Sequence, residues 1–262
     1  MFNYIEKFLR GLGKPLIGFI SRLGKLTIFI GRTLYNCITP PFYLKLLLKQ
    51  MVDIGFYSLP VVALTTVFAG MVIALQTNAG FSSYGAESAV AQVVLIAVTR
   101  ELAPVFSGLM VAGRIGAAMA AELGTMRVTE QIDALSTLST NPFKYLVTPR
   151  MLAAILVLPL LVLIGDIIGI LGGYTVAIYQ LEYNAANYIN TTINELQMID
   201  IYTGVIKGAV LGAIIALMGC YNGYESKGGA QGVGNATTNA VVSSSILILI
   251  CNYIITGMIF TK

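Results

Sequence analysis

The chain has 262 residues, of which 56% are hydrophobic and only 11% charged, and its mean hydropathy is +0.81. A soluble domain usually carries about 25% charged residues, so this composition argues against a water-facing globule. The net charge of +4 is too small to indicate nucleic-acid binding, and a chain without histidine has no Ser-His or Cys-His catalytic pair. Three isolated cysteines, Cys37, Cys220 and Cys251, provide neither a disulfide framework nor zinc-ligand spacing. The counts indicate a multi-pass membrane protein without metal or redox chemistry of its own.

Residues 1–50 are predicted to form an amphipathic helix at the inner membrane surface, or one packed against the other helices. Arg22 and Lys25 interrupt the apolar run that a cleavable signal peptide needs. Gly11, Gly13 and Pro15 predict a break or a late start of this helix. One face is apolar and the other basic: Leu9, Leu12, Leu16, Phe19, Leu23, Leu26 and Ile30 lie opposite Arg10, Lys14, Lys25 and Arg32.

Residues 51–262 are predicted to form the transmembrane domain. A helix needs about 20 mostly apolar residues to cross a bilayer, and about five segments meet that requirement. Strictly alternating strands are absent from the sequence, so we expect an all-α integral membrane protein rather than a barrel. The predicted spans are Ile54–Gln76, Val93–Ala120, Met151–Tyr179, Ile201–Tyr221 and Val241–Phe260.

The distribution of basic residues predicts the orientation of these spans. Residues 1–53 hold eight Lys and Arg and residues 121–150 hold three, whereas 77–92 and 180–200 hold none. Basic loops stay on the cytoplasmic side. We therefore expect the N-terminus inside and, after five crossings, the C-terminus outside, with Lys262 as the sole exterior cation.

Small residues recur every four positions in three of the spans. Such ladders let helix backbones approach closely inside a bilayer. We expect close packing within the chain, and the same pattern is compatible with a self-associating dimer. The ladders are Gly108, Ala112, Gly116, Ala120 and Gly124; Gly165, Gly169 and Gly173; and Gly204, Gly208 and Gly212.

Five charged residues fall within the predicted spans: Arg100, Glu101, Arg114, Asp166 and Lys207. An unpaired charge at mid-membrane costs roughly 2.5–3.5 kcal/mol on insertion scales, so each of them needs a partner or water. At about 1.5 Å per residue all but Arg114 reach the outer half of the membrane, where they are predicted to form one cluster. The first expected pair is Glu101–Lys207, and the adjacent Arg100 points elsewhere. The pattern fits a structural ionic network as well as a substrate site. Arg114, near the inner face, is expected to snorkel or to bind Glu122.

Two further segments are predicted on the inner side. Residues 122–142 contain a short apolar face, Ile132, Leu135 and Leu138, suited to a small helix that docks in a partner's groove. The glycine-rich run 228–238 lacks the G-x-x-x-x-G-K-[ST] pattern of a nucleotide-binding loop, so we expect a sharp turn there. Any nucleotide hydrolysis must then come from another chain.

Three stretches, RELAPVFSGLMVAGRIGAAMAAELGTMRVTEQIDAL (100–135), NPFKYLVTPRMLA (141–153) and GGAQGVGNATTNAVV (228–242), closely resemble the MlaE/YrbE-type ABC transporter permeases. The resemblance extends over roughly residues 45–260. It implies phospholipid transport between a bacterial inner membrane and the outer envelope. It also implies a permease homodimer with two cytoplasmic ABC ATPase subunits, which bind and hydrolyse ATP, and a periplasmic MCE-domain lipid-binding protein.

The same resemblance assigns roles to individual residues. It implies a lipid path lined by Leu75, Gln76, Tyr84, Arg100, Glu101 and Lys207, and an ATPase-facing set of Glu122, Arg127, Glu130 and Asp133. Some relatives carry an acidic residue near Asn252, where this chain has a neutral amide.

Three other functions compete with this interpretation. A membrane-embedded hydrolase or lipid transferase fits poorly, because Asp166 is the sole aspartate within a predicted span and a paired-aspartate site lacks its second member. An ion-driven secondary transporter fits better, since Glu101, Asp166 and Lys207 can relay protons. A scaffold role remains if neither lipid nor an ATPase binds.

Overall fold

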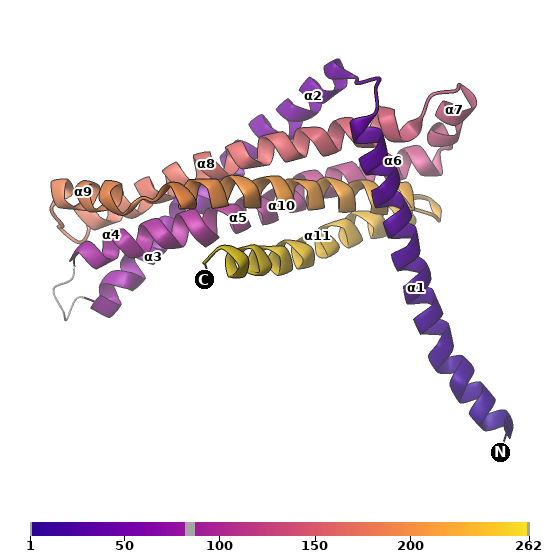
Figure 1. The fold of residues 1–262 in the computed structure, drawn as a ribbon, viewed down its shortest axis with the longest axis horizontal. Helices are drawn as coiled ribbons and strands as arrows, with labels where there is room; N and C mark the ends of the chain where they lie inside the picture. The colour runs from indigo at the N-terminus through magenta and orange to yellow at the C-terminus, as the bar shows by residue number, and fades with distance from the viewer. Residues whose placement is uncertain (1, 82–86, 261–262) are drawn as a thin grey trace.

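A computed structural model describes residues 2–81 and 87–260, and over these ranges the chain is helical, without a β-strand (Figure 1). The helices are α1 (Phe2–Ile38), α2 (Leu44–Gly55), α3 (Leu59–Phe81), α4 (Glu87–Ala97), α5 (Ala103–Val111), α6 (Ala117–Val128), α7 (Gln131–Thr137), α8 (Thr148–Tyr179), α9 (Ala185–Glu195), α10 (Met198–Tyr224) and α11 (Gly229–Phe260). Several of these helices are joined by one short 3₁₀ turn, η1 (Phe56–Ser58), and by three π turns, η3 (Val98–Leu102), η4 (Ala112–Gly116) and η5 (Phe143–Val147).

Five helical runs in the described part of the chain are long and apolar enough to cross a membrane, which confirms the predicted number. Each run extends beyond the predicted apolar core, because the helix continues into the polar residues at its ends. The second run is continuous from α4 to α6 and is widened by the π turns η3 and η4. The runs are Leu44–Phe81, Ser88–Val128, Phe143–Tyr179, Met198–Tyr224 and Gly229–Phe260.

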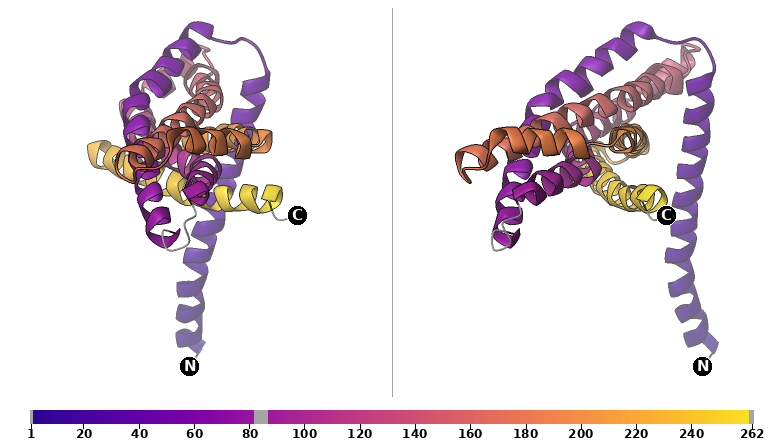
Figure 2. Two further views of the ribbon diagram at one scale, coloured as in Figure 1. Left: turned by 90° about the vertical axis from the view of Figure 1, so that its left-hand side faces the viewer. Right: turned by 60° about the vertical axis from the view of Figure 1, so that its left-hand side comes forward.

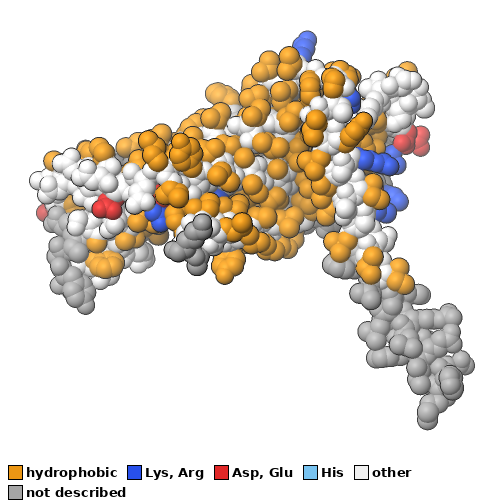
Figure 3. All heavy atoms as spheres, viewed as in Figure 1, with side chains coloured by type: hydrophobic (Ala, Val, Ile, Leu, Met, Phe, Trp, Pro, Cys, Tyr) orange, Lys and Arg blue, Asp and Glu red, His pale blue; other side chains and the backbone are white. Residues whose placement is uncertain are grey.

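The long helices run side by side, with α7 at one end of the bundle and α9 at the other (Figure 1). These ends are called the α7 end and the α9 end below. Helix α8 is central, since it packs against both α3 and α10. Apolar side chains cover the middle of the visible face, and the visible basic side chains gather mainly toward the α7 end (Figure 3). The surface thus has the layered polarity of a membrane protein.

Helix α1 crosses the bundle near the α7 end and extends away from it (Figure 2). Of the predicted apolar face, Leu23 is exposed and Leu26 and Ile30 are half-buried, whereas Phe29, which lies outside that set, is buried against Phe143 and Tyr221. The predicted break is absent, because the helix runs unbroken through Gly11, Gly13 and Pro15. A proline deletes one backbone hydrogen bond, and the remaining turns of this long helix continue past it.

The glycine ladders serve packing within the chain. A Cβ atom added to Gly70 of α3 would lie 1.9 Å from the carbonyl oxygen of Gly169 on α8. A Cβ added to Gly212 of α10 would lie 2.4 Å from the carbonyl oxygen of Ala154 on α8. No side chain larger than hydrogen fits at these crossings. The predicted close approach of α8 to its neighbours is confirmed.

Helix α11 begins at the predicted sharp turn, where Gly228 and Gly229 have φ angles of 91° and 68°. Beyond the turn, α11 is the least buried of the membrane-spanning helices. Only 11% of its most apolar window is buried, compared with 50% for the spans containing α8 and α10. Its outward face carries Val242, Ile246, Leu249, Tyr253 and Met258, all exposed. This face has room for lipid or for another protein helix.

Replacing Gly70 by Ala is expected to lower the free energy of unfolding by about 1–3 kcal/mol, because the added methyl group meets backbone that cannot rotate away. Gly80→Ala, in the same helix, is the matched control, since no heavy atom lies within 4 Å of a Cβ added there. Thermal unfolding of both variants in mild detergent measures the difference. Equal melting temperatures would show that the α3–α8 crossing is not tight.

Candidate functional site: an intramembrane polar cluster

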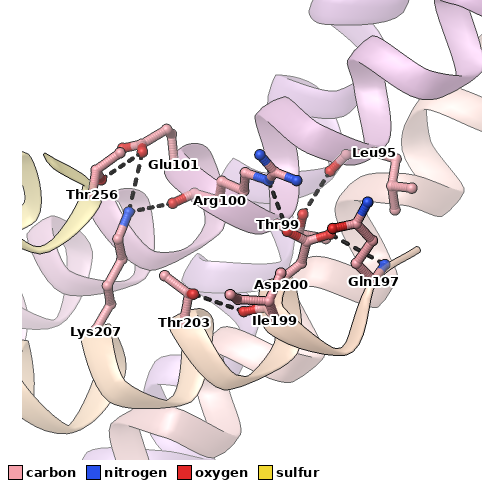
Figure 4. A network of polar contacts seen from close by, with 10 residues as sticks. All are labelled: Leu95, Thr99, Arg100, Glu101, Gln197, Ile199, Asp200, Thr203, Lys207 and Thr256. Carbon is pink, nitrogen blue, oxygen red and sulfur yellow. Dashed lines mark hydrogen bonds and ion pairs between the residues drawn. The ribbon is translucent and has the colours of Figure 1, made fainter. Parts of the chain in front are cut away.

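The site is built around Pro104, which follows η3 in the second membrane-spanning run. A proline has no N–H to give to the carbonyl four residues earlier, so the carbonyl of Arg100 lacks its usual helical donor. The Nζ of Lys207, from α10, donates to this carbonyl. The π turn η3 that accommodates the proline carries both Arg100 and Glu101, and Figure 4 shows their side chains pointing apart.

Glu101 lies at the centre of one half of the site. Its Oε1 accepts from Lys207 Nζ at 3.2 Å and from Thr256 Oγ1 at 2.7 Å, and its Oε2 accepts from Asn252 Nδ2 at 2.6 Å. The Lys207 side chain is completely buried, whereas that of Glu101 is 40% exposed. The predicted Glu101–Lys207 pair is therefore present, and the lysine depends on Glu101 for its counter-charge.

Arg100 forms the other half. Its Nε donates to Asp200 Oδ1 at 2.7 Å, and its guanidinium lies 4.3 Å from the centre of the Phe260 ring. Asp200 is fully buried, and its second oxygen accepts from the backbone N–H of Gln197 at 3.3 Å, which caps the start of α10. The Arg100 side chain remains 23% exposed, so it is not fully enclosed by these partners.

We call Arg100, Glu101, Asp200, Lys207, Asn252 and Thr256 the polar cluster. Three of its members were not among the predicted site residues. Asp200 ends the 180–200 stretch, which the sequence predicts outside the spans, although its position in the first turn of α10 is the signal of a capping acid. Asn252 joins the cluster as a hydrogen-bond donor even though it is neutral, and Thr256 follows one helical turn later. The sequence signal for Asn252 is a polar amide within an otherwise apolar span.

Asp166 lies outside these bonds. It is 7% exposed, and its Oδ1 has no hydrogen-bond partner among the described residues. Its other carboxyl oxygen lies against Gly204 of α10, 3.6 Å from where a Cβ would be. Asp166 thus sits next to the polar cluster without an ion pair in it, and the expected four-charge cluster contains Asp200 in its place.

An apolar groove begins directly after Arg100 and Glu101 in the chain. It lies between α3 and the second membrane-spanning run and has a volume of about 490 Å³. One wall starts at Leu102, the residue after Glu101. The lining residues are Leu64, Thr65, Phe68, Ala69, Val72, Ile73, Leu102, Phe106 and Met110. The second membrane-spanning run therefore contributes residues both to the polar cluster and to the groove.

Two of the predicted path residues do not line this groove. Leu75 and Gln76 are exposed near the end of α3 and do not line the groove. Tyr84 lies outside the described residues. Arg114 does not bind Glu122: it donates to the Ser58 hydroxyl at 2.8 Å and to the Asp53 carbonyl at 3.1 Å. Those groups lie closer to Arg114 because the helix of the first span begins beside it.

The predicted ATPase-facing residues gather at the α7 end. Glu122 pairs with the buried Arg150 at 2.8 Å, and Arg127 pairs with Asp133 at 2.6 Å. Glu130 precedes α7 with a positive φ of 60° and an exposed side chain. Helix α7 is the predicted short helix, with Ile132 buried and Leu138 75% exposed. Glu122, Glu130 and Asp133 thus present exposed carboxylates around a small helix that is anchored by Ile132.

The sequence matches the model of a family described as permease MlaE over residues 47–258. A probable ABC transporter permease protein of Rickettsia bellii is 55% identical over 249 residues, which cover 95% of this chain and 96% of the relative. The chloroplastic protein TRIGALACTOSYLDIACYLGLYCEROL 1 of Arabidopsis thaliana is 36% identical over 96% of this chain and 68% of its own length. The intermembrane phospholipid transport system permease protein MlaE of Haemophilus influenzae is 31% identical over 98% of both chains.

Glu101→Gln is expected to destabilise the fold by about 3–5 kcal/mol, because it leaves the buried ammonium of Lys207 without a carboxylate. Adding Lys207→Met should recover much of that loss. The exposed pair Lys25–Glu225, at 3.4 Å, is the control, and its removal should cost less than about 1 kcal/mol. Thermal unfolding of the single and double variants measures both couplings. Additive effects at Glu101 and Lys207 would contradict the assignment.

Proposed function

Since the chain belongs to the MlaE family of ABC transporter permeases, we propose that it forms the lipid pathway of an ATP-driven phospholipid transporter. In this proposal, phospholipid moves between the inner membrane of a bacterium and its outer envelope. The name of the Haemophilus relative, an intermembrane phospholipid transport system permease protein, supports the choice of substrate. ATP is bound and hydrolysed by separate subunits.

The observation that carries the proposal is that one helical run contributes Arg100 and Glu101 to the polar cluster and Leu102, Phe106 and Met110 to the apolar groove. A phospholipid needs a site for an anionic phosphate next to a surface for acyl chains. The Arg100 side chain is partly exposed, and the first groove residue of the same helical run, Leu102, follows two positions later. Guanidinium groups bind phosphate through two parallel hydrogen bonds. The headgroup accordingly lies at Arg100, with an acyl chain along Phe68, Val72 and Phe106.

The bundle is oriented with its α7 end in the cytoplasm. The basic residues of the N-terminal segment and of 121–150 support this, because positively charged loops are retained inside. Helix α1, which runs crosswise near that end, then lies along the inner leaflet with its N-terminus inside (Figure 2). The polar cluster, toward the α9 end, lies in the outer half of the membrane.

Three protein contacts complete the transporter. Two ABC ATPase subunits dock at α7, one on each permease, because its exposed carboxylates and Leu138 are presented beyond the bundle. A second copy of the chain packs on the exposed apolar face of α11, the least buried span, to form a homodimer. A periplasmic MCE-domain protein receives or delivers lipid at the α9 end.

An ion-coupled secondary transporter is the alternative, favoured by one observation: the buried and unpaired carboxyl of Asp166. ATP dependence separates the two. Transport by the chain alone, driven by a proton gradient without ATP or an ATPase, would favour the alternative.

Arg100→Ala is expected to slow phospholipid transfer at least about tenfold, since a charged hydrogen bond to phosphate contributes about 1.5–3 kcal/mol. Glu101→Ala and Lys207→Ala should also reduce transfer, because they remove the hydrogen bonds of Lys207 to Glu101 and to the carbonyl of Arg100, which hold the turn that carries Arg100. Lys45→Ala, an exposed lysine outside the polar cluster, is the control. The assay is transfer between reconstituted vesicles at matched protein content. Wild-type rates in all three variants would remove the cluster from the lipid path.

Glu130→Lys is expected to weaken the association of the ATPase about tenfold, because it reverses a charge on the proposed docking surface. Glu182→Lys is a closely matched control: both glutamates are exposed and have positive φ, 60° and 58°, but they lie at opposite ends of the bundle. Co-purification of the ATPase in gentle detergent measures the effect. Equal loss in both variants, or in neither, would argue against docking at α7.

A further inference from the structure

A second polar cavity, with a volume of about 540 Å³, lies where α10 ends and α11 begins, whereas the polar cluster lies at the start of α10. Helix α1 contributes one wall through Lys25. The turn after α10 contributes Glu225 and Lys227, and the first turns of α11 contribute the amides Asn235 and Asn239. The lipid path described above makes no use of this cavity.

The turn between α10 and α11 is held firmly by its neighbours. Ser226 is buried, and its Oγ donates to the carbonyl of Gly124 on α6 at 3.2 Å. A Cβ added to Gly232 would collide with the carbonyl oxygen of Lys227, so the first turn of α11 packs directly on that residue. The backbone that carries Glu225 and Lys227 is therefore fixed between α6 and α11, and the wall of the cavity is formed before any ligand binds.

The charges around this cavity leave one cation without a counter-charge. Lys25 Nζ lies 3.4 Å from Glu225 Oε2, and the two side chains are 53% and 39% exposed. The Lys227 side chain is exposed and has no ion pair among the described residues. Lys227 follows Glu225 by two residues, which span at most about 7 Å, so the three charged groups surround one small space. The lining thus has one positive charge in excess.

A phosphate group fits this lining. Ammonium groups bind phosphate as point charges, and amide side chains donate further hydrogen bonds to oxygen acceptors. The cavity also lies at the level of lipid headgroups, because the fourth span ends at Tyr224 and the fifth begins at Gly229. This is the α7 end, toward which the visible basic side chains gather (Figure 3). Basic pockets between spans at such a surface bind the headgroups of anionic lipids.

We propose that this cavity is a second phosphate-binding site, in which Lys25 and Lys227 share one phosphate group and Asn235 and Asn239 donate hydrogen bonds to it. The phosphate displaces the Glu225 carboxylate from Lys25. Because Lys25 belongs to α1 and Lys227 follows α10, the bound phosphate fastens α1 to the bundle. The site does not depend on the lipid path at Arg100. A lipid headgroup and a soluble phosphate ester offer the same chemistry, and the experiment separates them.

Binding is measured by native mass spectrometry of the full chain in a neutral detergent, with phosphatidylglycerol as the probe and the matching diacylglycerol as the reference without phosphate. The double variant Lys25→Gln with Lys227→Gln is expected to weaken the binding of one phosphatidylglycerol per chain about tenfold or more, and to leave diacylglycerol unaffected. The matched control, Lys45→Gln with Lys49→Gln, removes the same charge from α2 outside the cavity and should change the affinity less than about twofold. All four lysines are exposed, so both double variants should fold. Equal weakening by the two double variants, or by neither, would overturn the site.

Glu225→Gln tests the competition for Lys25. It should tighten phosphatidylglycerol binding about two- to fivefold, because an exposed ion pair of this kind contributes up to about 1 kcal/mol. Glu130→Gln makes the same charge change at the α7 end outside the cavity and should leave the affinity unchanged. Weaker binding in Glu225→Gln would contradict the shared phosphate. Displacement of the lipid by excess glycerol 3-phosphate would support a site for phosphate from either source, and retention of the lipid would support a site for lipid phosphate.

Failure of this site and failure of the proposed function are distinguishable. Phosphatidylglycerol binding that responds to Arg100→Ala but not to the Lys25 and Lys227 double variant would overturn the second site and leave the lipid path intact. Binding that responds to the double variant, together with wild-type transfer by Arg100→Ala, would support the second site and count against the lipid path.

Discussion

The ammonium group of Lys207 sets the constraint on which the membrane core depends. A fully buried cation is tolerated only where acceptors surround it. Two are supplied by neighbouring residues of one π turn: the backbone carbonyl of Arg100, which Pro104 deprives of its helical donor, and the carboxylate of Glu101. The carbonyl left without a helical donor by Pro104 in the second span thus accepts the hydrogen bond that Lys207 in the fourth span needs to donate. Glycines at 204 and 208 allow α10 to approach α8 at this level, where Gly208 lies against Pro159.

The same arrangement determines how α11 is held. That helix buries little of its surface, yet Asn252 and Thr256 donate to the two oxygens of Glu101. Phe260, near the end of α11, lies over the guanidinium of Arg100. The polar contacts of α11 with the second span therefore converge on Arg100 and Glu101. Any opening between α11 and that span separates charged hydrogen bonds in an apolar medium, and a competing anion or amine lowers the cost of that separation.

The part of this architecture that a sequence reveals is the part governed by local rules. Apolar length predicted five spans, and depth within the spans predicted the Glu101–Lys207 pair, because both follow from the bilayer as a solvent. Which polar group each charged side chain would bind, where several lie at similar depth, could not be predicted from the sequence. Arg114 binds Ser58 and the Asp53 carbonyl, and Glu122 instead binds Arg150, because the crossing geometry of α8 decides which side chains meet. Asp200 was missed for a related reason: its helix starts earlier than its apolar core, which moved a loop acid into the cluster.

One helical run links the two functional regions of the molecule. Ser88–Val128 carries Arg100 near one end and Arg127 near the other, about 40 Å apart at the rise of an α-helix. Two π turns, η3 and η4, interrupt its regular bonding, and the first of them holds Arg100 and Glu101. Such turns are where a long helix changes its bonding with the least loss, because their hydrogen bonds are already irregular. If an ATPase moves α7, the motion travels along this run as a rigid element and is absorbed first at η4 and η3. The turn η3 holds Glu101, the counter-charge of Lys207, and Arg100, the counter-charge of Asp200. Movement of α7 at one end of the run would in this way change the ion pairing at the other end.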